Sequence, residues 1–359
     1  FDYLGATCPS LLLEPSRTNL FPQSEYFSAV STGLQSWNYT DATATNNSTI
    51  SPQGVNNAAK LIEGSSNSRH SVWTNQTTTA SNNTISVFLK KGTRRYASIV
   101  TSDTTSWNTM VVVDLEEGII TSIFNKSGYV SVDKIENYGN GWYRVTSSIN
   151  GAYSGNAFYS RFNIQESATP SNPPSNGYQG NGTDYIYIFG AQFETNSSYA
   201  TSYIPTYGVS QTRAGDFSNI DNLDDFATSG TSWTATGEFI KGQDQQDSLY
   251  ILFAYYLSSS NLFRIRDFID SVRFYLFLPS QVSYGITATL GQTIKWAIRA
   301  KSDGSYSVYV NGALLGEISG TFRKLDKLLL SGLYAKNKIK QVLVFPTALS
   351  DTELATLTT

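Results

Sequence analysis

Hydrophobic and polar side chains alternate with a period of two along much of the chain. The clearest strand-like segments are residues 85–89, 96–100, 110–113, 142–146 and 185–189. Each is short, rich in β-branched and aromatic residues, and bounded by Gly, Asn, Asp or Ser, a combination typical of β-strands. Strands that follow one another at a spacing of about ten residues favour β-sandwiches or barrels. The pattern therefore predicts an all-β fold.

One short helix is predicted near the C-terminus. Ser350, followed three residues later by Glu353, forms a capping box, in which the two side chains hydrogen-bond free backbone N–H groups at the start of a helix. We expect Leu354 and Leu357 to face the interior from this helix.

Two stretches interrupt the alternation and indicate how the chain is divided. Residues 168–182 are rich in Pro, Gly and Asn and predict an exposed loop. Residues 212–229 hold a cluster of aspartates without alternation, after which a new all-β pattern starts. A length of 359 residues suggests two domains. We therefore expect a first β-sandwich in residues 1–212, a linker in residues 213–229 and a second β-sandwich in residues 230–359.

Composition narrows the class of partner. Charged residues make up only 15% of the chain, and Lys+Arg of 25 against Asp+Glu of 28 leaves a net charge of −3, so no basic field indicates nucleic acid. No apolar run reaches the roughly 18 residues of a membrane helix, so no membrane insertion is predicted. The polar balance rests on Ser, Thr, Asn and Tyr, whose neutral hydrogen-bonding groups suit a sugar-facing surface.

The sequence predicts no catalytic residues. His70 is the only histidine and Cys8 the only cysteine, which excludes a His-rich zinc site and an internal disulfide. Paired glycosidase carboxylates need a defined spacing, and the nearest candidate, residues 114–118, has the wrong spacing and is typical of a hairpin turn. No P-loop or dinucleotide fingerprint is present. We interpret His70, a lone histidine next to Arg69 in a predicted strand, as a surface residue or a satisfied polar residue.

The first domain resembles a known fold family through its two ends. It opens with the residues LLLEPSRTNL and closes with a set that includes GAQFE and ATSYIPT, at residues 11–20, 190–194 and 200–206. Together they resemble the jelly-roll domain common in bacteriophage tail and structural proteins, which is similar to carbohydrate-binding modules of the family 4/9/22 type. The resemblance covers about residues 4–213.

The second domain carries a separate resemblance. Residues 295–299, 307–312 and 342–354 look like a laminin-G/concanavalin-like lectin domain over about residues 230–359. Within it, Asn311-Gly312 supplies the two positive-φ residues of a type I′ hairpin turn. Both resemblances imply β-sandwiches, and their combination is usual in receptor-recognising phage proteins and in secreted polysaccharide-processing proteins.

The resemblance of the first domain implies a sugar-binding strand. In the related modules, an Arg and a Trp at the spacing of Arg69 and Trp73 lie near the start of a strand on the concave face, where the Trp stacks on a sugar ring. Residues 69, 71 and 73 alternate onto one face of a strand. The alternative is that Trp73 belongs to the core and Arg69 caps a sheet edge.

Three further aromatic residues flanked by polar residues are candidate ligand contacts, Trp37, Tyr39 and Trp107. Trp107 lies in a loop-like setting in which an exposed ring suits a ligand. Trp142, within a strand, is interpreted as core, and so are Trp233 and Trp296 of the second domain.

The same family often holds a structural Ca²⁺ where the chain ends meet. Glu25, Gln192 and Glu194 fall at the matching parts of the family pattern. The usual paired aspartates of the last strand are replaced by residues 190–192, Gly-Ala-Gln, so whether this chain holds Ca²⁺ stays open.

These observations favour a non-catalytic, glycan-binding or adhesion part of a phage tail or related virion structure, located on the virion or outside the cell. Its partner would be a polysaccharide or cell-surface glycan, held by stacking and neutral hydrogen bonds, and fibre proteins of this kind are frequently homo-oligomers. Two alternatives remain open. The chain could be a purely structural spacer or decoration module of a virion, or an accessory binding module of a polysaccharide-degrading enzyme.

Overall fold

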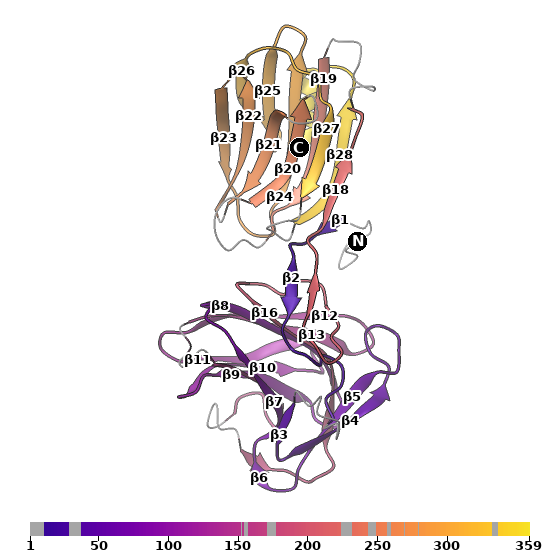
Figure 1. Cartoon of the computed structure of the whole chain (residues 1–359), viewed down its shortest axis with the longest axis vertical. Helices are drawn as coiled ribbons and strands as arrows, with labels where there is room; N and C mark the ends of the chain where they lie inside the picture. Colours follow the sequence, from indigo (N-terminus) through magenta and orange to yellow (C-terminus); the bar gives the residue numbers. More distant parts are fainter. Residues whose placement is uncertain are drawn as a thin grey trace. The chain divides into compact units, whose positions relative to one another are not determined.

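The structure, a computed structural model, consists mainly of antiparallel β-strands (Figure 1), and a short helix lies at the C-terminus of the residues that it describes. It describes residues 11–28, 37–151, 153, 157–170, 177–223, 232–242, 249–256, 260–268, 270–278, 280–331 and 337–359. The predicted all-β class is confirmed. The chain divides into two compact units, which we call unit 1 (Phe1–Ser16 and Ala214–Thr359) and unit 2 (Arg17–Arg213).

Unit 2 contains two six-stranded sheets that share one core. The sheet that we call the front sheet has the order β11-β10-β9-β14-β7-β3, and the back sheet has the order β12-β13-β8-β16-β5-β4. The front strands are β3 (Asn38–Thr40), β7 (His70–Thr77), β9 (Tyr96–Ser102), β10 (Trp107–Asp114), β11 (Ile119–Asn125) and β14 (Ala157–Gln165). The back strands are β4 (Ala42–Thr49), β5 (Ala58–Glu63), β8 (Asn82–Lys91), β12 (Val130–Asn137), β13 (Trp142–Asn150) and β16 (Tyr185–Thr195).

Two small ribbons complete unit 2. Strand β6 (Asn67–Ser68) pairs with β15 (Tyr178–Gln179) beside the start of β7. Strand β2 (Arg17–Asn19) pairs with β17 (Gln211–Arg213). Because these last two strands begin and end the unit, the chain enters and leaves unit 2 through adjacent strands.

Unit 1 is also built from two six-stranded antiparallel sheets around a single core. The first has the order β1-β28-β19-β24-β25-β26, with β1 (Leu11–Leu13), β19 (Ser232–Ile240), β24 (Thr293–Lys301), β25 (Ser305–Val310), β26 (Ala313–Ser319) and β28 (Asn337–Phe345). The second has the order β18-β27-β20-β21-β22-β23, with β18 (Phe217–Ile220), β20 (Leu249–Tyr256), β21 (Ser260–Asp267), β22 (Ser271–Leu278), β23 (Ser280–Thr287) and β27 (Lys327–Ser331).

The division of the chain differs from the expected one at both ends of the first domain. Strand β1 pairs with β28, so the N-terminal segment belongs to unit 1 and not to the jelly-roll part. Strand β18, inside the expected linker at residues 213–229, pairs with β27 and is part of a sheet. These short strands gain their partners from residues far along the chain, and such long-range pairing leaves no local sequence signal. The division at residue 213 lies next to the expected one at residue 212.

Local predictions are largely confirmed. Helix α2 (Asp351–Thr358) begins with the capping box of Ser350 and Glu353. In the hairpin turn, Asn311 and Gly312 have φ of 48° and 84°, as a type I′ turn requires. Leu354 is buried as expected, but Leu357, in the last turn of the helix, is exposed. In the described part of the chain, no helix combines the length and the apolar character needed to cross a membrane.

The pairing of β1 with β28 predicts that the N-terminal segment stabilises unit 1. Leu13 is 2% exposed within the core of that unit. Leu13→Ala removes buried methyl groups, so we expect unit 1 to lose about 2–5 kcal/mol of unfolding free energy. Scanning calorimetry of the whole chain should show a lower midpoint for the transition of unit 1 only. Leu357→Ala, which changes an exposed leucine of the same unit, should leave the midpoint of the unit 1 transition unchanged.

Residues 17–213 expressed alone identify the calorimetric transition of unit 2. A Leu13→Ala variant that lowers that transition instead would contradict the assignment of β1 to unit 1.

Candidate functional site

Side chains on the outer face of the front sheet form rows across neighbouring strands. We call outer the face that points away from the core of unit 2, to which Val72 and Phe162 belong. Trp73 follows Val72 on β7, and Arg161 precedes Phe162 on β14. Because Trp73 and Arg161 are cross-strand partners, they project outward together. Asn38 of β3 pairs with Trp73 and extends this row, which we call row A.

A second row runs parallel to row A. Asn75 pairs with Tyr159, Tyr159 with Ser102, and Ser102 with Trp107. We call these four residues row B. Trp107 is half-buried and opens strand β10, so it lies on the sheet and not on a loop as its sequence setting indicated. The register therefore places Trp107 on the same face as Trp73, with Tyr159 between their strands.

Trp73 combines partial exposure with an incomplete set of contacts. Its side chain is half-buried, and its ring centroid lies 6.1 Å from that of Tyr159. The guanidinium carbon of Arg161 stands 4.7 Å from the centroid of the indole ring, a cation–π contact. The indole Nε1 is buried and has no hydrogen-bond acceptor. Trp73 is thus a surface residue of the front sheet, and the alternative of a core position does not hold.

Arg161 belongs to row A, whereas Arg69 precedes strand β7 and lies outside both rows. Both side chains are half-buried. Burial lowers the pKa of the Arg161 guanidinium, and the positive charge of Arg69 lowers it further. Among the described residues neither arginine has a carboxylate partner, whereas Arg94 and Arg95 of the same unit are both ion-paired.

Trp37 and Tyr39 do not belong to this face, which corrects the expectation that they contact a ligand. Trp37 is 1% exposed, packs against Phe21 and Phe27 with centroid distances of 5.2 and 4.9 Å, and donates from Nε1 to the Gln23 carbonyl. Tyr39 pairs with Val72, so it faces the core, and its hydroxyl donates to a backbone carbonyl. Polar neighbours in the sequence indicated exposure, but the alternation on β3 turns Tyr39 inward.

The outer face is covered at the end of the sheet that holds the row of Ser71, Asn163 and Ser98. Ser71 pairs with Asn163, and Asn163 with Ser98, in a row that is at most 2% exposed. Thr121 and Ser122 donate to the Ala168 carbonyl over 2.9 and 3.0 Å, which holds the segment after β14 against this end of the sheet. Rows A and B consist of exposed or half-buried residues, whereas the continuation of row A on β9 and β10, Val100 and Met110, is buried.

Sequence reasoning missed Tyr159 and Arg161. Both alternate with buried residues along β14, so the sequence pattern could have predicted that their side chains point outward. The pattern could not have predicted their proximity to Trp73, because it depends on the pairing of two strands distant in sequence.

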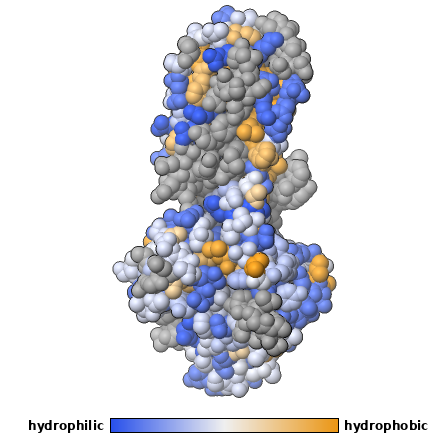
Figure 2. All heavy atoms as spheres, in the orientation of Figure 1, coloured by the Kyte–Doolittle hydropathy of each residue, from blue (hydrophilic) through white to orange (hydrophobic). Residues whose placement is uncertain are grey.

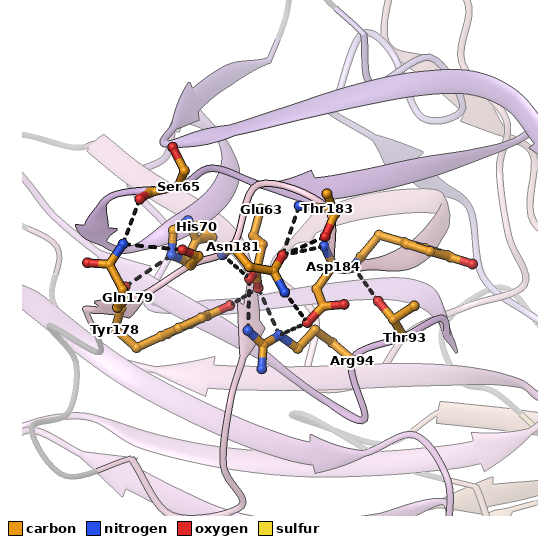
Figure 3. A network of polar contacts seen from close by, with 12 residues as sticks. Glu63, Ser65, His70, Thr93, Arg94, Tyr178, Gln179, Asn181, Thr183 and Asp184 are labelled. Atoms are coloured by element: carbon orange, nitrogen blue, oxygen red, sulfur yellow. Dashed lines mark hydrogen bonds and ion pairs between the residues drawn. The ribbon is translucent and has the colours of Figure 1, made fainter.

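A polar network anchors the segment before β16 to the neighbouring strands (Figure 3). His70, which is fully buried, places Nδ1 2.7 Å from the Asp41 carbonyl and Nε2 3.2 Å from the Tyr178 carbonyl. Its ring meets that of Tyr178 edge-on at 4.5 Å. Nδ1 also lies 3.1 Å from the Asp41 carboxylate and 3.2 Å from the Gly64 nitrogen, so the fully buried His70 ties β7 to the segments around Asp41, Gly64 and Tyr178.

Glu63 is the centre of the network in Figure 3. Its carboxylate accepts two hydrogen bonds of 2.8 Å from Arg94, one of 2.7 Å from the Tyr178 hydroxyl and one of 2.9 Å from the Asn181 N–H. Burial alone would raise the pKa of Glu63, but these donors outweigh it and hold the pKa below its ordinary value. Tyr178 is 5% exposed, so this part of residues 168–182 is not the exposed loop expected; residues 171–176 lie outside the described residues.

The proposed Ca²⁺ ligands do not fit a cation. Both oxygens of Glu194 accept from Thr201, over 3.1 and 2.6 Å, and Oε1 of Gln192 accepts 2.7 Å from the N–H of Ile204. Glu25 accepts from two tyrosine hydroxyls and an asparagine amide. Donors thus occupy the oxygens that a cation would need. Within the ranges that the structure describes, no group of three or more His, Cys, Asp and Glu could hold a metal.

Comparisons with known proteins do not define a family. A scan with models of protein families and a search of curated proteins found no match. Similar solved structures include botulinum neurotoxin type C, whose cell entry depends on two ganglioside molecules, at 12% identity and a TM-score of 0.33, covering 40% of each chain. Another is the CBM40 of the Ruminococcus gnavus IT-sialidase, at 16% identity and a TM-score of 0.31, covering 38% of this chain and 86% of that one. Similarity at this level carries no conclusion about function.

The Glu63 network predicts a specific sensitivity to acid. Because its folded-state pKa is below the ordinary value of 4.5, its contribution to stability is complete above about pH 4.5 and is lost as the pH falls through the folded-state pKa. Glu63→Gln should cost about 1.5–3 kcal/mol near neutrality, the range for hydrogen bonds to a charged group. Its unfolding free energy should then fall less on acidification than that of the unchanged protein.

Chemical denaturation across this pH range measures both effects. Glu136→Gln, at the surface ion pair with Lys134, is the control and should change neither. An acid dependence in Glu63→Gln equal to that of the unchanged protein would refute the role assigned to the network.

Proposed function

We propose that unit 2 binds a glycan on rows A and B of the front sheet, as a non-catalytic recognition domain. The observation that supports this most directly is the half-buried Trp73, flanked by Tyr159 and Arg161 on an accessible sheet face. The C–H faces of a sugar ring are apolar, so a partly exposed indole gains contact area with them without burying an unpaired polar group.

The rest of the two rows suits the hydroxyl groups of a sugar. Asn38 and Asn75 are exposed, Ser102 is half-buried, and all three project from the face that carries the aromatic rings. Amide and hydroxyl groups both donate and accept, as sugar hydroxyls do. In the view of Figure 2, the coloured surface of unit 2 is mostly hydrophilic to neutral, with small apolar groups near its centre and at its right edge. Stacking combined with neutral hydrogen bonds is therefore the mode of binding that we propose.

The same face supports binding without covalent chemistry. Rows A and B contain no carboxylate, histidine or cysteine, so no general base within them would activate the Ser102 or Tyr159 hydroxyl. The wider role that we propose, adhesion by a part of a phage tail or related virion structure, is based on the jelly-roll resemblance of the sequence. A structural spacer is the alternative, and it requires no ligand on this face.

Trp73→Ala should weaken glycan binding and leave the fold intact. Losing a well-packed aromatic anchor costs about 1–3 kcal/mol of binding free energy, or roughly 5- to 150-fold in affinity. Since Trp73 lies outside the core, the thermal unfolding midpoint of the Trp73→Ala variant should fall little. Trp37→Ala is the matched control, because it removes a core tryptophan of the same unit. It should cost about 3–5 kcal/mol of folding stability and leave the affinity per folded molecule unchanged.

A glycan array probed with the intact chain finds the ligand, and titration calorimetry with the variants measures the affinity. Two results would reject the proposal. The first is binding to no glycan on the array, as the spacer alternative predicts. The second is an unchanged affinity in Trp73→Ala together with a large loss of stability.

A further inference from the structure

Arginine and aromatic side chains alternate on the outer face of the second sheet of unit 1. Strands β21, β22 and β23 are neighbours in that sheet (Figure 1). Ile265 of β21 and Phe274 of β22 are partners that point into the core, so the residues that flank them on each strand point away from it. We call the side chains gathered on this face the arginine ladder. They are Arg264, Arg266, Phe268, Arg273, Tyr275 and Phe277.

Two rings of the ladder are each shared by two guanidinium groups. The guanidinium carbons of Arg264 and Arg266 lie 5.5 and 5.4 Å from the ring centroid of Tyr275. Those of Arg266 and Arg273 lie 5.4 and 5.1 Å from the ring centroid of Phe268. Cation–π contacts therefore hold three positive charges in one continuous row.

The ladder borders on an exposed polar strip of β23. Gln281 and Ser283 of that strand are exposed and pair with Phe277 and Tyr275. Arg264 lies 4.5 Å from the ring centroid of Phe277 and donates to Oε1 of Gln281 over 3.3 Å, so its guanidinium group reaches across β22 towards the strip. Amide and hydroxyl groups thus lie beside the positive charges, in a part of the face that solvent reaches.

Two of the positive charges are direct cross-strand partners. Arg266 pairs with Arg273, and like charges opposite one another destabilise a sheet. Arg273 is exposed and makes no ion pair with a described residue, and its side chain lies across Gly285, where a Cβ would come within 3.4 Å of its Cγ. Asp267, the next residue on β21, is buried and ion-paired with Lys241. The sheet retains adjacent positive charges at a cost that an anionic ligand would offset.

The rings of the ladder are poor platforms for stacking. Tyr275 points away from the core but is only 6% exposed, and two guanidinium groups adjoin its ring. Phe268 and Phe277 are half-buried, and each adjoins at least one guanidinium group. A single-stranded nucleic acid needs open ring faces for its bases, and a membrane surface needs apolar side chains that insert. The ladder offers charge and hydrogen-bond donors instead.

We propose that the outer face of β21, β22 and β23 binds an acidic polysaccharide. The ladder arginines bind its carboxylate or sulfate groups, and Gln281 and Ser283 bind its hydroxyl groups. A guanidinium group stacked on a ring directs its N–H groups outward from its edge, where they match the oxygens of an acidic group. Outward positions repeat about every 7 Å along a strand, so Arg264 and Arg266 can contact successive acidic groups of a polymer. This site lies on unit 1 and does not depend on the function proposed for unit 2.

The test uses the full chain, with and without Trp73→Ala, and polysaccharides in matched acidic and neutral pairs. The pairs are polygalacturonate with its methyl ester, and dextran sulfate with dextran. We expect the acidic member of at least one pair to bind at least about tenfold more tightly than the neutral member, an advantage that shrinks with added salt. The pair that shows it identifies the acidic group, and Trp73→Ala should leave it unchanged.

Variants then locate the source of the preference. Arg273→Gln and Arg266→Gln should each weaken binding of the acidic member about tenfold, the loss expected for hydrogen bonds to a charged group. Arg273→Lys, which keeps the charge without the planar fork, should recover part of the loss. Lys340→Gln removes a surface positive charge from β28, in the other sheet of unit 1, and should have no effect. Because Arg273 is exposed, its variants should keep their thermal midpoints, which show that they are folded.

Three results would overturn the inference. They are equal binding within both pairs, an acidic preference that both glutamine variants leave intact, and tighter binding of single-stranded DNA or phosphatidylserine vesicles than of every polysaccharide. The function proposed for unit 2 is decided separately, because glycan binding that is lost in Trp73→Ala and kept in Arg273→Gln belongs to rows A and B.

Discussion

The pairing of β7 with β14 is the constraint on which the candidate site depends. Val72 and Phe162 are partners that enter the core, so their neighbours Trp73 and Arg161 must leave it. A shift of the register by one residue would bury the guanidinium group and expose the core phenylalanine, a change with a cost that no local contact could recover. The position of the tryptophan on the surface is thus enforced by apolar packing on the other side of the sheet.

The sequence predicted the features that depend on neighbouring residues and missed the contacts between strands that are distant along the chain. The type I′ turn at Asn311 and the capping box are local, and the structure has them. Ser71 and Trp73 alternate on β7 as expected, whereas Arg69 precedes that strand. The partnership of Trp73 with Arg161 joins strands that are distant in the sequence, and no periodicity reveals it. Trp37 was misassigned for a related reason, because polar neighbours describe its local sequence, while a cluster of phenylalanines from elsewhere in unit 2 determines its burial.

Unit 2 treats its charged side chains in two different ways. Around Glu63, burial is matched by four hydrogen bonds, and the network joins strand β5 to the segment that precedes β16. Beside Trp73, partial burial of Arg161 is matched only by an aromatic ring. Fully satisfied networks stabilise a fold, whereas unsatisfied groups are retained at a cost in stability, and such groups concentrate where proteins interact with other molecules. The contrast between the two sites is an electrostatic reason to separate the structural one from the one proposed to bind.

The insertion of unit 2 into unit 1 has a mechanical consequence. A force applied to a ligand on unit 2 would pass into unit 1 through two covalent connections, one before β2 and one after β17. The first leads to β1 and the second to β18, which belong to different sheets of unit 1. Tension would therefore be divided between both layers of that sandwich, and neither edge strand would carry the full pull alone.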